Sequence, residues 1–276
     1  MGLKRASWLA AAVALAAGAA FAGPITPLAQ SPTLNRDQIV FAWADHLWSV
    51  PRAGGTARQI TSAGHEAHPV FSPDGEWIAY RGEVDGNYDV YVVPAKGGAP
   101  RRLTFHPGVD EPVGWTPDGK SVLFTSTREA YANIQRLYTV PLEGGWQTTL
   151  PMWRAVEGTY SPDGARVAYV PNNKWQKEWK RYRGGQATPI WLARLGDLQV
   201  EKIPRDRSND SQPVWVGDMV YFLSDRDGPV TLYGYDTRTK AVRRLIDNRG
   251  LDLKTLSGGA WSTRMSTLRE VPSARE

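Results

Sequence analysis

The chain offers few side chains that could carry out catalysis. It contains no cysteine and four histidines, His46, His65, His68 and His106. Nucleophilic catalysis requires a serine or cysteine with a base and an orienting group in reach. The G-x-S-x-G sequence that marks one kind of serine nucleophile does not occur. Because all four histidines fall in predicted turns or loops, the sequence predicts no catalytic constellation, and hence no enzyme.

Metal-ligand types occur in three short segments. His65-Glu66-Ala67-His68 is one residue shorter than the zinc sequence H-E-x-x-H, and it lies in a predicted loop instead of on a helix. The segments 85–89 and 225–228 contain acidic residues, as calcium loops do, but lack the ligand series that ends in glutamate. Tight turns between strands account for both segments. We therefore expect no metal site and no cofactor.

A basic and aromatic segment, 174–183, is the most unusual stretch on the predicted surface. It carries five positive charges, one negative charge and three aromatic side chains. Such a surface favours an anionic partner, which could be a peptide carboxylate, an anionic polymer or a membrane headgroup. Alternatively, Trp175 and Trp179 pack on the fold while the charged groups stay in water. The candidate binding residues of this segment are Lys180, Arg181 and Arg183.

The first 22 residues have the features of an export signal. Lys4 and Arg5 precede an apolar run from Trp8 to Ala19, and residues 20–22 fit the A-x-A cleavage pattern. A buried alanine-rich helix is the alternative. The apolar run is short for a membrane span, so we expect no stable membrane insertion after cleavage behind Ala22. The sequence predicts a periplasmic or secreted protein, for which nucleic acid is not an expected partner.

The candidate binding residues must be positioned by the fold, and the rest of the sequence repeats one short pattern. The segments 71–80, 115–124 and 160–169 each combine a Pro-Asp-Gly turn with a following run of apolar residues. Proline presets φ for the first corner of the turn, and glycine accepts a positive φ at its end. The turn prolines are 44 residues apart (117 − 73) and then 45 apart (162 − 117). Such a period is typical of solenoids and propellers.

The strand pattern within each repeat favours a propeller. Each unit contains four short strands joined by tight turns, which is the content of one blade. Second strands such as 167–170 and 220–223 are apolar at successive positions, as expected where a sheet is covered on both faces. Fourth strands carry arginines, which suit an outer edge that must not pair with other molecules. We predict an all-β propeller of four-stranded antiparallel blades, with five recognisable blades and an incomplete sixth.

The repeats also predict the domain limits. Residues 1–22 form the signal peptide, 23–35 a lead-in segment, 36–255 the propeller and 256–276 an irregular or disordered tail. The fourth blade carries an insertion at 172–188 between its second and third strands. This insertion contains the basic segment described above.

Several phrases resemble one family of repeats. The Ser-Pro-Asp-Gly turns are similar to those of TolB-type and tricorn-type propellers, and three further phrases, 137–145, 179–185 and 221–228, resemble the N-terminal six-bladed propeller of tricorn-like serine peptidases. The resemblance covers about 32–255. In that family a second propeller, a PDZ-like domain and the catalytic core follow, and none of these is present here. The resemblance therefore implies an accessory role, such as gating or guiding peptides, without hydrolysis by this chain.

The same resemblance implies a place for peptide binding. In tricorn-like peptidases, a basic loop of this propeller is thought to anchor the carboxyl ends of peptides. Arg128 and Arg136, which flank the loop 129–135, are the nearest candidates here. The expected partners are peptides or proteins, and a separate peptidase core is a further one.

Two other functions stay open. The first is a TolB-like periplasmic scaffold that binds proteins, and the second is a hydrolase that acts alone, which the lack of a nucleophile constellation disfavours. We also predict an incomplete ring. The 254 residues after the signal correspond to about 5.8 blades at the observed period, and the segment after residue 258 differs from the family in the way a truncated or frame-shifted end would. An open ring would leave apolar flanks of blades one and five uncovered.

Overall fold

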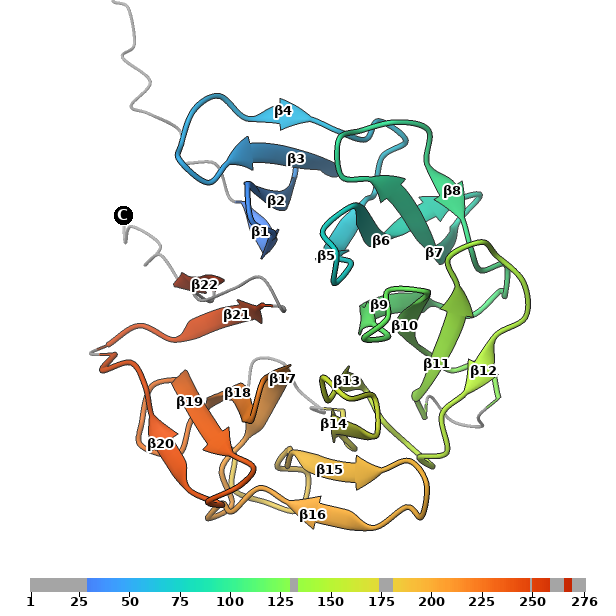
Figure 1. Ribbon diagram of the computed structural model, residues 1–276. Coiled ribbons are helices and arrows are strands. Elements are labelled where there is room, and N and C mark those ends of the chain that lie inside the picture. The colour runs from blue at the N-terminus through green and yellow to red at the C-terminus, as the bar shows by residue number, and fades with distance from the viewer. Residues whose placement is uncertain (1–28, 130–133, 174–180, 249, 259–265, 270–276) are drawn as a thin grey trace, which may run out of the picture.

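The computed structural model describes residues 29–129, 134–173, 181–248, 250–258 and 266–269, which contain strands, turns and loops but no helix. Five four-stranded antiparallel sheets and one two-stranded sheet are arranged in a ring (Figure 1). The predicted all-β propeller with five complete blades is confirmed. Within the described residues, no helix is long and apolar enough to cross a membrane.

The strands follow one another around the ring in chain order. Four belong to each of the first five blades, and two to the sixth position: β1 (Gln30–Leu34), β2 (Gln38–Trp43), β3 (His46–Pro51), β4 (Arg58–Gln59), β5 (Ala67–Phe71), β6 (Trp77–Val84), β7 (Asn87–Pro94), β8 (Arg101–Arg102), β9 (Asp110–Trp115), β10 (Ser121–Ser126), β11 (Arg136–Pro141), β12 (Thr148–Thr149), β13 (Glu157–Tyr160), β14 (Arg166–Val170), β15 (Trp191–Arg194), β16 (Val200–Lys202), β17 (Asp210–Val216), β18 (Met219–Ser224), β19 (Thr231–Asp236), β20 (Val242–Arg244), β21 (Leu253–Ser257) and β22 (Ser266–Arg269).

The Pro-Asp-Gly turns join the first and second strands of blades two to four. In blade two, the Gly75 amide donates to the Ser72 carbonyl at 2.9 Å, and the Trp77 amide donates to the Ser72 hydroxyl at 3.0 Å. Gly75 has φ 76°, which a residue with a side chain rarely adopts. Because each turn closes its own backbone hydrogen bonds, the repeat fixes where the next strand begins.

Burial follows the blade order. In β14 the four residues from Val167 to Val170 are all buried, although successive side chains point to opposite faces of the sheet. This confirms the prediction that second strands are covered on both faces. The fourth strands are the outer edges of their sheets, and both residues of β4 are exposed. The core therefore lies between blades, where the side chains of neighbouring sheets meet.

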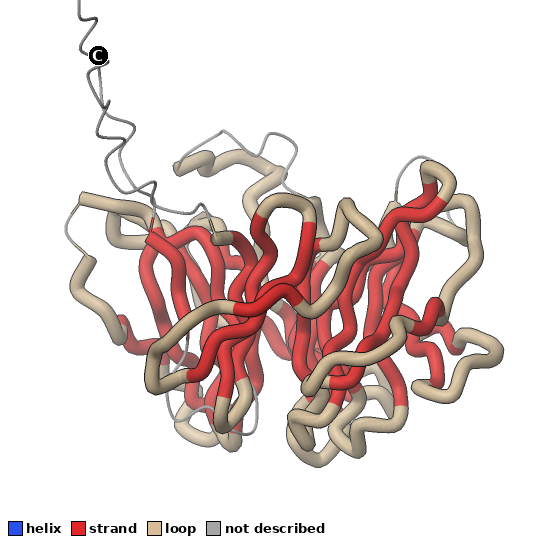
Figure 2. Tube along the Cα trace, turned by 90° about the horizontal axis from the view of Figure 1, so that it is seen from above, coloured by secondary structure: helices blue, strands red, loops and turns tan. Residues whose placement is uncertain are grey.

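The ring has two distinct faces, and Figure 2 shows the loops gathered above and below the strands. One face carries the Pro-Asp-Gly turns, and we name it the turn face. The opposite face carries the connections between blades and those between second and third strands, including the described residues of 172–188. We name it the insertion face. The start of each innermost strand lies at the insertion face, because antiparallel strands reverse direction at every turn.

The inner wall of the ring is closed at the sixth position. β21 contacts both β17 and β1, and all six innermost strands surround the axis (Figure 1). The Ser257 hydroxyl donates to the Pro32 carbonyl, and Leu253 and Leu256 cover apolar side chains of blade five. The expected opening is therefore not found at this wall. The flank of blade one is less covered, since Trp43 on β2 is 38% exposed.

Two predicted boundaries differ from the structure. The lead-in segment 23–35 contains β1, which pairs with β2 and supplies the innermost strand of blade one. The tail 256–276 contains the end of β21 and all of β22, which pair with each other. β1 and β22 are short and have few apolar residues, so neither produces the alternating pattern by which strands are recognised in sequence.

Candidate functional site

A cavity of about 2090 Å³ occupies the axis of the ring. Its lining reaches from Pro73, Pro117 and Pro162 in the turn face to Arg154 and Arg181 in the insertion face, so we describe it as a central channel. The wall consists of the innermost strand of every blade. The channel thus follows from the fold. The side chains near the starts of the six innermost strands determine which ligands it can bind.

One residue near the start of each innermost strand lines the channel at the insertion face. These six form what we name the channel ring: Ser31, His68, Glu111, Glu157, Gln212 and Lys254. All are polar, and two carry carboxylates. A ring of mixed hydrogen-bonding groups suits an extended polar ligand such as a peptide better than an apolar one.

β-Bulges place several of these side chains. The pairing register shifts around Ser31 in β1, His68 in β5 and Gln212 in β17, and each of the three precedes a proline. Their φ values are 47°, 55° and 53°. A bulge leaves one residue out of the ladder and re-aims its side chain. In β21 the register shifts around Lys254 in the same way. Ser31, His68 and Gln212, whose backbone is strained, therefore lie at the same level of the channel.

Glu111 contacts two side chains of the neighbouring blade. Its Oε1 lies 2.5 Å from His68 Nδ1, and its Oε2 lies 3.3 Å from Arg81 Nη1. All three side chains are partly exposed, so water screens the pairing. These contacts join blade two to blade three across the channel wall, and they give Glu111 a cationic neighbour in Arg81.

Glu157 has a different environment. Its Oε2 accepts a 2.5 Å hydrogen bond from the backbone amide of Gln212 on the neighbouring blade. Burial raises the pKa of the Glu157 carboxyl, the hydrogen bond from Gln212 opposes this rise, and the negative charge of Glu111 adds to it. Within the described residues no cation pairs with Glu157.

Two arginines stand at the mouth of the channel. Arg154 lies in the connection between blades three and four, and Arg181 lies in the insertion of blade four. Both side chains are exposed, and in the described parts of the chain neither has an ion-pair partner. Arg181 was predicted as a binding residue, and the structure places it on the channel lining. Guanidinium groups in this situation can receive a carboxylate through paired hydrogen bonds.

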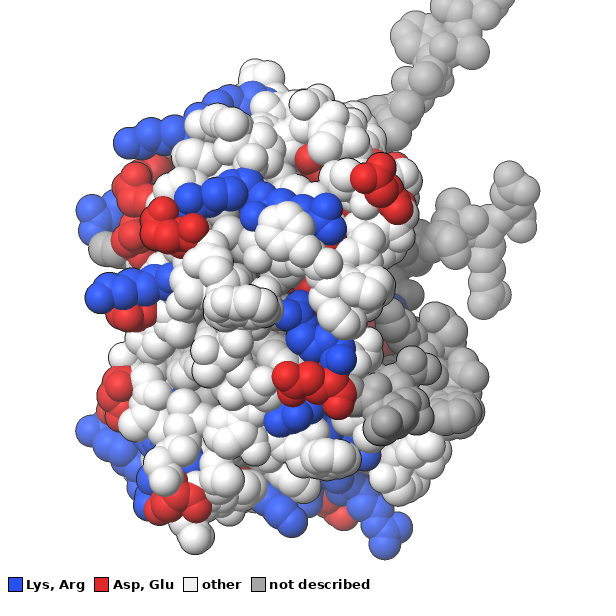
Figure 3. Space-filling view, turned by 90° about the vertical axis from the view of Figure 1, so that its right-hand side faces the viewer, with Lys and Arg blue, Asp and Glu red and all other residues white. Residues whose placement is uncertain are grey.

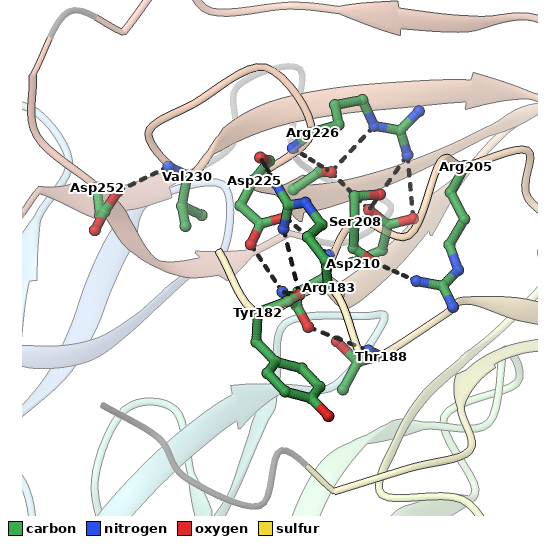
Figure 4. A network of polar contacts seen from close by, with 12 residues as sticks. Tyr182, Arg183, Thr188, Arg205, Ser208, Asp210, Asp225, Arg226, Val230 and Asp252 are labelled. Carbon is green, nitrogen blue, oxygen red and sulfur yellow. Dashed lines mark hydrogen bonds and ion pairs between the residues drawn. The ribbon is translucent and has the colours of Figure 1, made fainter. Parts of the chain in front are cut away.

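The other predicted residues of the basic segment have different positions. Lys180 lies outside the described residues. Arg183 contacts Asp225 of blade five, with 2.9 Å from Nη1 to Oδ1 and 2.8 Å from Nη2 to the carbonyl oxygen (Figure 4). Asn209 bonds both the Tyr182 carbonyl and Asp225, each at 2.8 Å. Arg183 thus fixes the base of the insertion, and this holds Arg181 close to the channel mouth.

Arg128 and Arg136 are engaged in ion pairs. The Arg128 side chain is 9% exposed, and it pairs with the buried Asp110 and lies over the rings of Phe124 and Tyr138. Arg136 lies 3.1 Å from Glu129 and is 20% exposed. Residues 130–133 of the loop between them lie outside the described residues. In this arrangement Arg128 holds its own blade together.

The contact of Arg128 recurs in blade five. Arg226 pairs with the buried Asp210 at 3.1 Å and lies over Phe222 and Tyr233. In both blades a serine two residues before the arginine accepts hydrogen bonds from it, and that serine pairs in register with the aspartate. We name this arrangement the blade staple. The sequence signal is Phe-x-Ser-x-Arg, at 124–128 and 222–226.

The histidines are separated from one another. His46 and His68 lie next to Glu66 and Glu111, and His65 lies 3.9 Å from Glu83. The His106 ring accepts a hydrogen bond from the Gly108 amide at 2.9 Å. Across the described ranges, no group of three or more His, Cys, Asp and Glu side chains could hold a metal ion.

The outer side of the ring carries charges of both signs. Figure 3 shows basic and acidic side chains interspersed on the side formed by blades two and three. One pair there joins Arg101 to Glu143 at 3.3 Å. This face therefore presents no single-sign surface for a polyanion.

Sequence reasoning did not identify Arg154 or Glu157 as site residues. Arg154 belongs to an irregular connection with no repeated pattern, so nothing in the sequence distinguishes it. Glu157 could have been found, because it stands where His68, Glu111 and Gln212 precede proline in the other repeats. In blade four the proline is replaced by Gly158, which hides the correspondence.

Blades of four antiparallel strands around an axial channel define a β-propeller. Residues 26–262 match the family model of the tricorn protease N-terminal beta propeller domain, and the chain belongs to this family. It is 32% identical over 205 residues to tricorn protease homolog 1 of Streptomyces coelicolor, covering 73% of this chain and 19% of that protein. To the tricorn protease of Thermoplasma acidophilum it is 29% identical over 226 residues, covering 78% and 21%. The chain thus spans about a fifth of the length of these relatives.

Solved structures agree with this assignment. The crystal structure of the tricorn protease superposes with a TM-score of 0.76 and 26% identity, covering 88% of this chain and 24% of that one. A putative TolB from Agrobacterium tumefaciens gives a TM-score of 0.65 at 24% identity, covering 80% and 81%. The second likeness concerns the fold alone. The part of the tricorn relatives that the chain matches is their N-terminal propeller domain.

Proposed function

We propose that this chain is an exported, non-catalytic propeller that binds peptides in its central channel and guides them to a separate peptidase. The observation that carries this proposal is the pair Arg154 and Arg181 at the mouth of a polar channel, neither of which has an ion-pair partner among the described residues. Membership of the tricorn propeller family supports the peptide as ligand. The histidine contacts support the lack of catalysis, because among the described residues His46 and His68 contact carboxylates, His106 accepts from a backbone amide and His65 lies 3.9 Å from Glu83, so no ring contacts a serine.

The role of the two arginines can be tested with a flexible synthetic peptide of about ten residues that carries an internal fluorophore. Replacing both by glutamine is expected to weaken binding of the free-carboxylate peptide about tenfold, the effect of losing a charge-assisted contact. Amidation of the peptide should weaken wild-type binding by a similar factor. Fluorescence anisotropy measures both, and chromatography should recover the peptide intact.

The matched control is Arg194→Gln, which removes one exposed charge on the outer part of blade four. This variant should bind as the wild type does. Equal binding by the wild type and the double variant would contradict the role of the arginines. Turnover of the peptide that disappears on mutation of one serine or histidine would contradict the non-catalytic proposal.

Export is the second part of the proposal. The charged start, the apolar run and the Ala20-Phe21-Ala22 pattern support cleavage behind Ala22. These residues lie outside the described part of the chain. Protein recovered from outside the cytoplasm of a bacterial host is expected to begin at Gly23. N-terminal sequencing measures this directly, and an intact Met1 on such material would show that no signal is removed.

A further inference from the structure

Glu157 differs from several other partly or fully buried carboxylates of the insertion face. Four of these have an arginine partner, in the pairs Asp110–Arg128, Asp210–Arg226, Asp225–Arg183 and Glu111–Arg81. Glu157 lines the channel and has none among the described residues. A carboxylate withdrawn from bulk water is costly to keep without a positive neighbour. A positive group of a ligand would supply the missing neighbour.

The surroundings of Glu157 hold its carboxylate in place. Its Oε2 is bound by the backbone amide of Gln212 at 2.5 Å. The side chain of Gln212 is in turn bonded to β21, with Nε2 at 3.2 Å from the Lys254 carbonyl and Oε1 at 2.6 Å from the Leu256 amide. Gln212 therefore cannot move away without losing its two hydrogen bonds to β21. One carboxylate oxygen is fixed, and within the described residues nothing donates to the other.

We propose that Glu157 binds the primary ammonium group of a peptide inside the channel. An ammonium group offers three donors, so it can bond Oε1 of Glu157 and still reach the polar groups of neighbouring channel-ring residues. Calcium would need six to eight oxygen ligands, whereas among the described residues no group of even three His, Cys, Asp and Glu side chains could hold a metal ion. The negative charge of Glu111 on the next innermost strand adds to the attraction for a cation.

The inference rests on the proposed function, because it assumes that peptides enter the channel. It adds a binding site for the opposite end of the peptide. Arg154 and Arg181 at the mouth would receive a carboxylate, and Glu157 in the channel ring would receive an amine. The amine could be the N-terminus or a lysine side chain. Peptides with only one of these groups free distinguish the two sources.

The test compares peptides of about ten residues with a free or an acetylated N-terminus, each with and without an internal lysine. Acetylation of the lysine-free peptide should weaken its binding to the wild type about tenfold. Glu157→Gln should weaken binding of the free-amine peptide by a similar factor and remove the effect of acetylation. If the internal lysine restores binding of the acetylated peptide, the site accepts lysine side chains as well.

The matched control is Glu143→Gln, which removes an exposed carboxylate on the outer side of blade three. Its binding should equal that of the wild type. A peptide that binds the wild type equally well with and without acetylation would overturn the ammonium site while leaving the proposed function standing.

A second probe separates the two proposals. Butylammonium carries no carboxylate and needs no peptide-binding channel. It should shift the carbon-13 NMR signal of the Glu157 carboxyl, which is assigned by its absence in Glu157→Gln. A shift supports the ammonium site even if no peptide binds. No shift at saturating butylammonium would overturn it.

Discussion

Replacing Arg226 by alanine is expected to destabilise the protein by about 3–5 kcal/mol, because it leaves the Asp210 carboxylate buried without its cation. The Asp210 side chain is fully buried, and Arg226 reaches both of its oxygens, at 3.2 and 3.1 Å. The substitution also removes the guanidinium that packs over Phe222 and Tyr233. Chemical denaturation of the two proteins measures the difference.

The pH dependence gives this prediction a second readout. Burial raises the pKa of Asp210, and Arg226 counteracts that rise. Without Arg226 the folded-state pKa rises further above the unfolded value. A group with a raised folded pKa contributes stability at low pH that is lost as the pH increases through the folded pKa. The deficit of Arg226→Ala should therefore be larger at neutral pH than in weak acid.

Two controls distinguish the loss of the Asp210–Arg226 ion pair from a general loss of stability. Arg194→Ala removes one partner of an exposed pair with Asp197 and should change the stability by less than about 1 kcal/mol. Adding Asp210→Asn to Arg226→Ala removes the buried charge and should recover part of the loss. If Arg226→Ala is as mild as Arg194→Ala, the blade staple does not stabilise blade five.

Only part of the fold could be predicted from the sequence. The turn at Pro73 and its two repeats have strong local chemistry, so blade number, strand order and turn positions follow from the sequence. Local chemistry is weak in β1, where Gln30–Leu34 has little apolar character. Its place is decided by pairing with β2 and by contacts to β5 and β21, which join residues far apart in the chain. Such tertiary contacts are invisible to periodicity.

For the same reason, the sequence alone could not show which arginines pair with aspartates of the protein and which remain available to a ligand. Arg128, Arg181 and Arg183 are all basic residues in predicted loops. Arg128 and Arg183 pair with the buried aspartates Asp110 and Asp225, which lie 18 and 42 residues away in the sequence. Arg181 has no such partner among the described residues, and it lines the channel. Only the fold decides which positive charges are neutralised by the protein and which remain for a ligand.

The absence of cysteine makes the central claim directly measurable. Thr159 lies on β13 two residues after Glu157, so the pleat places both side chains on the channel side, and both line the cavity. Thr159→Cys therefore introduces a single thiol inside the channel, and a small alkylating reagent can report its accessibility. A peptide bound in the channel should shield this thiol.

The decisive measurement is the alkylation rate of Thr159→Cys with and without the free-ended peptide, with Arg243→Cys on the exposed strand β20 as the outside reference. At peptide concentrations of about ten times Kd, roughly a tenth of the protein is free, so the rate at position 159 should fall about tenfold. The rate at position 243 should not change. If peptide binds but both thiols react as fast as before, the ligand does not occupy the channel and the account is wrong.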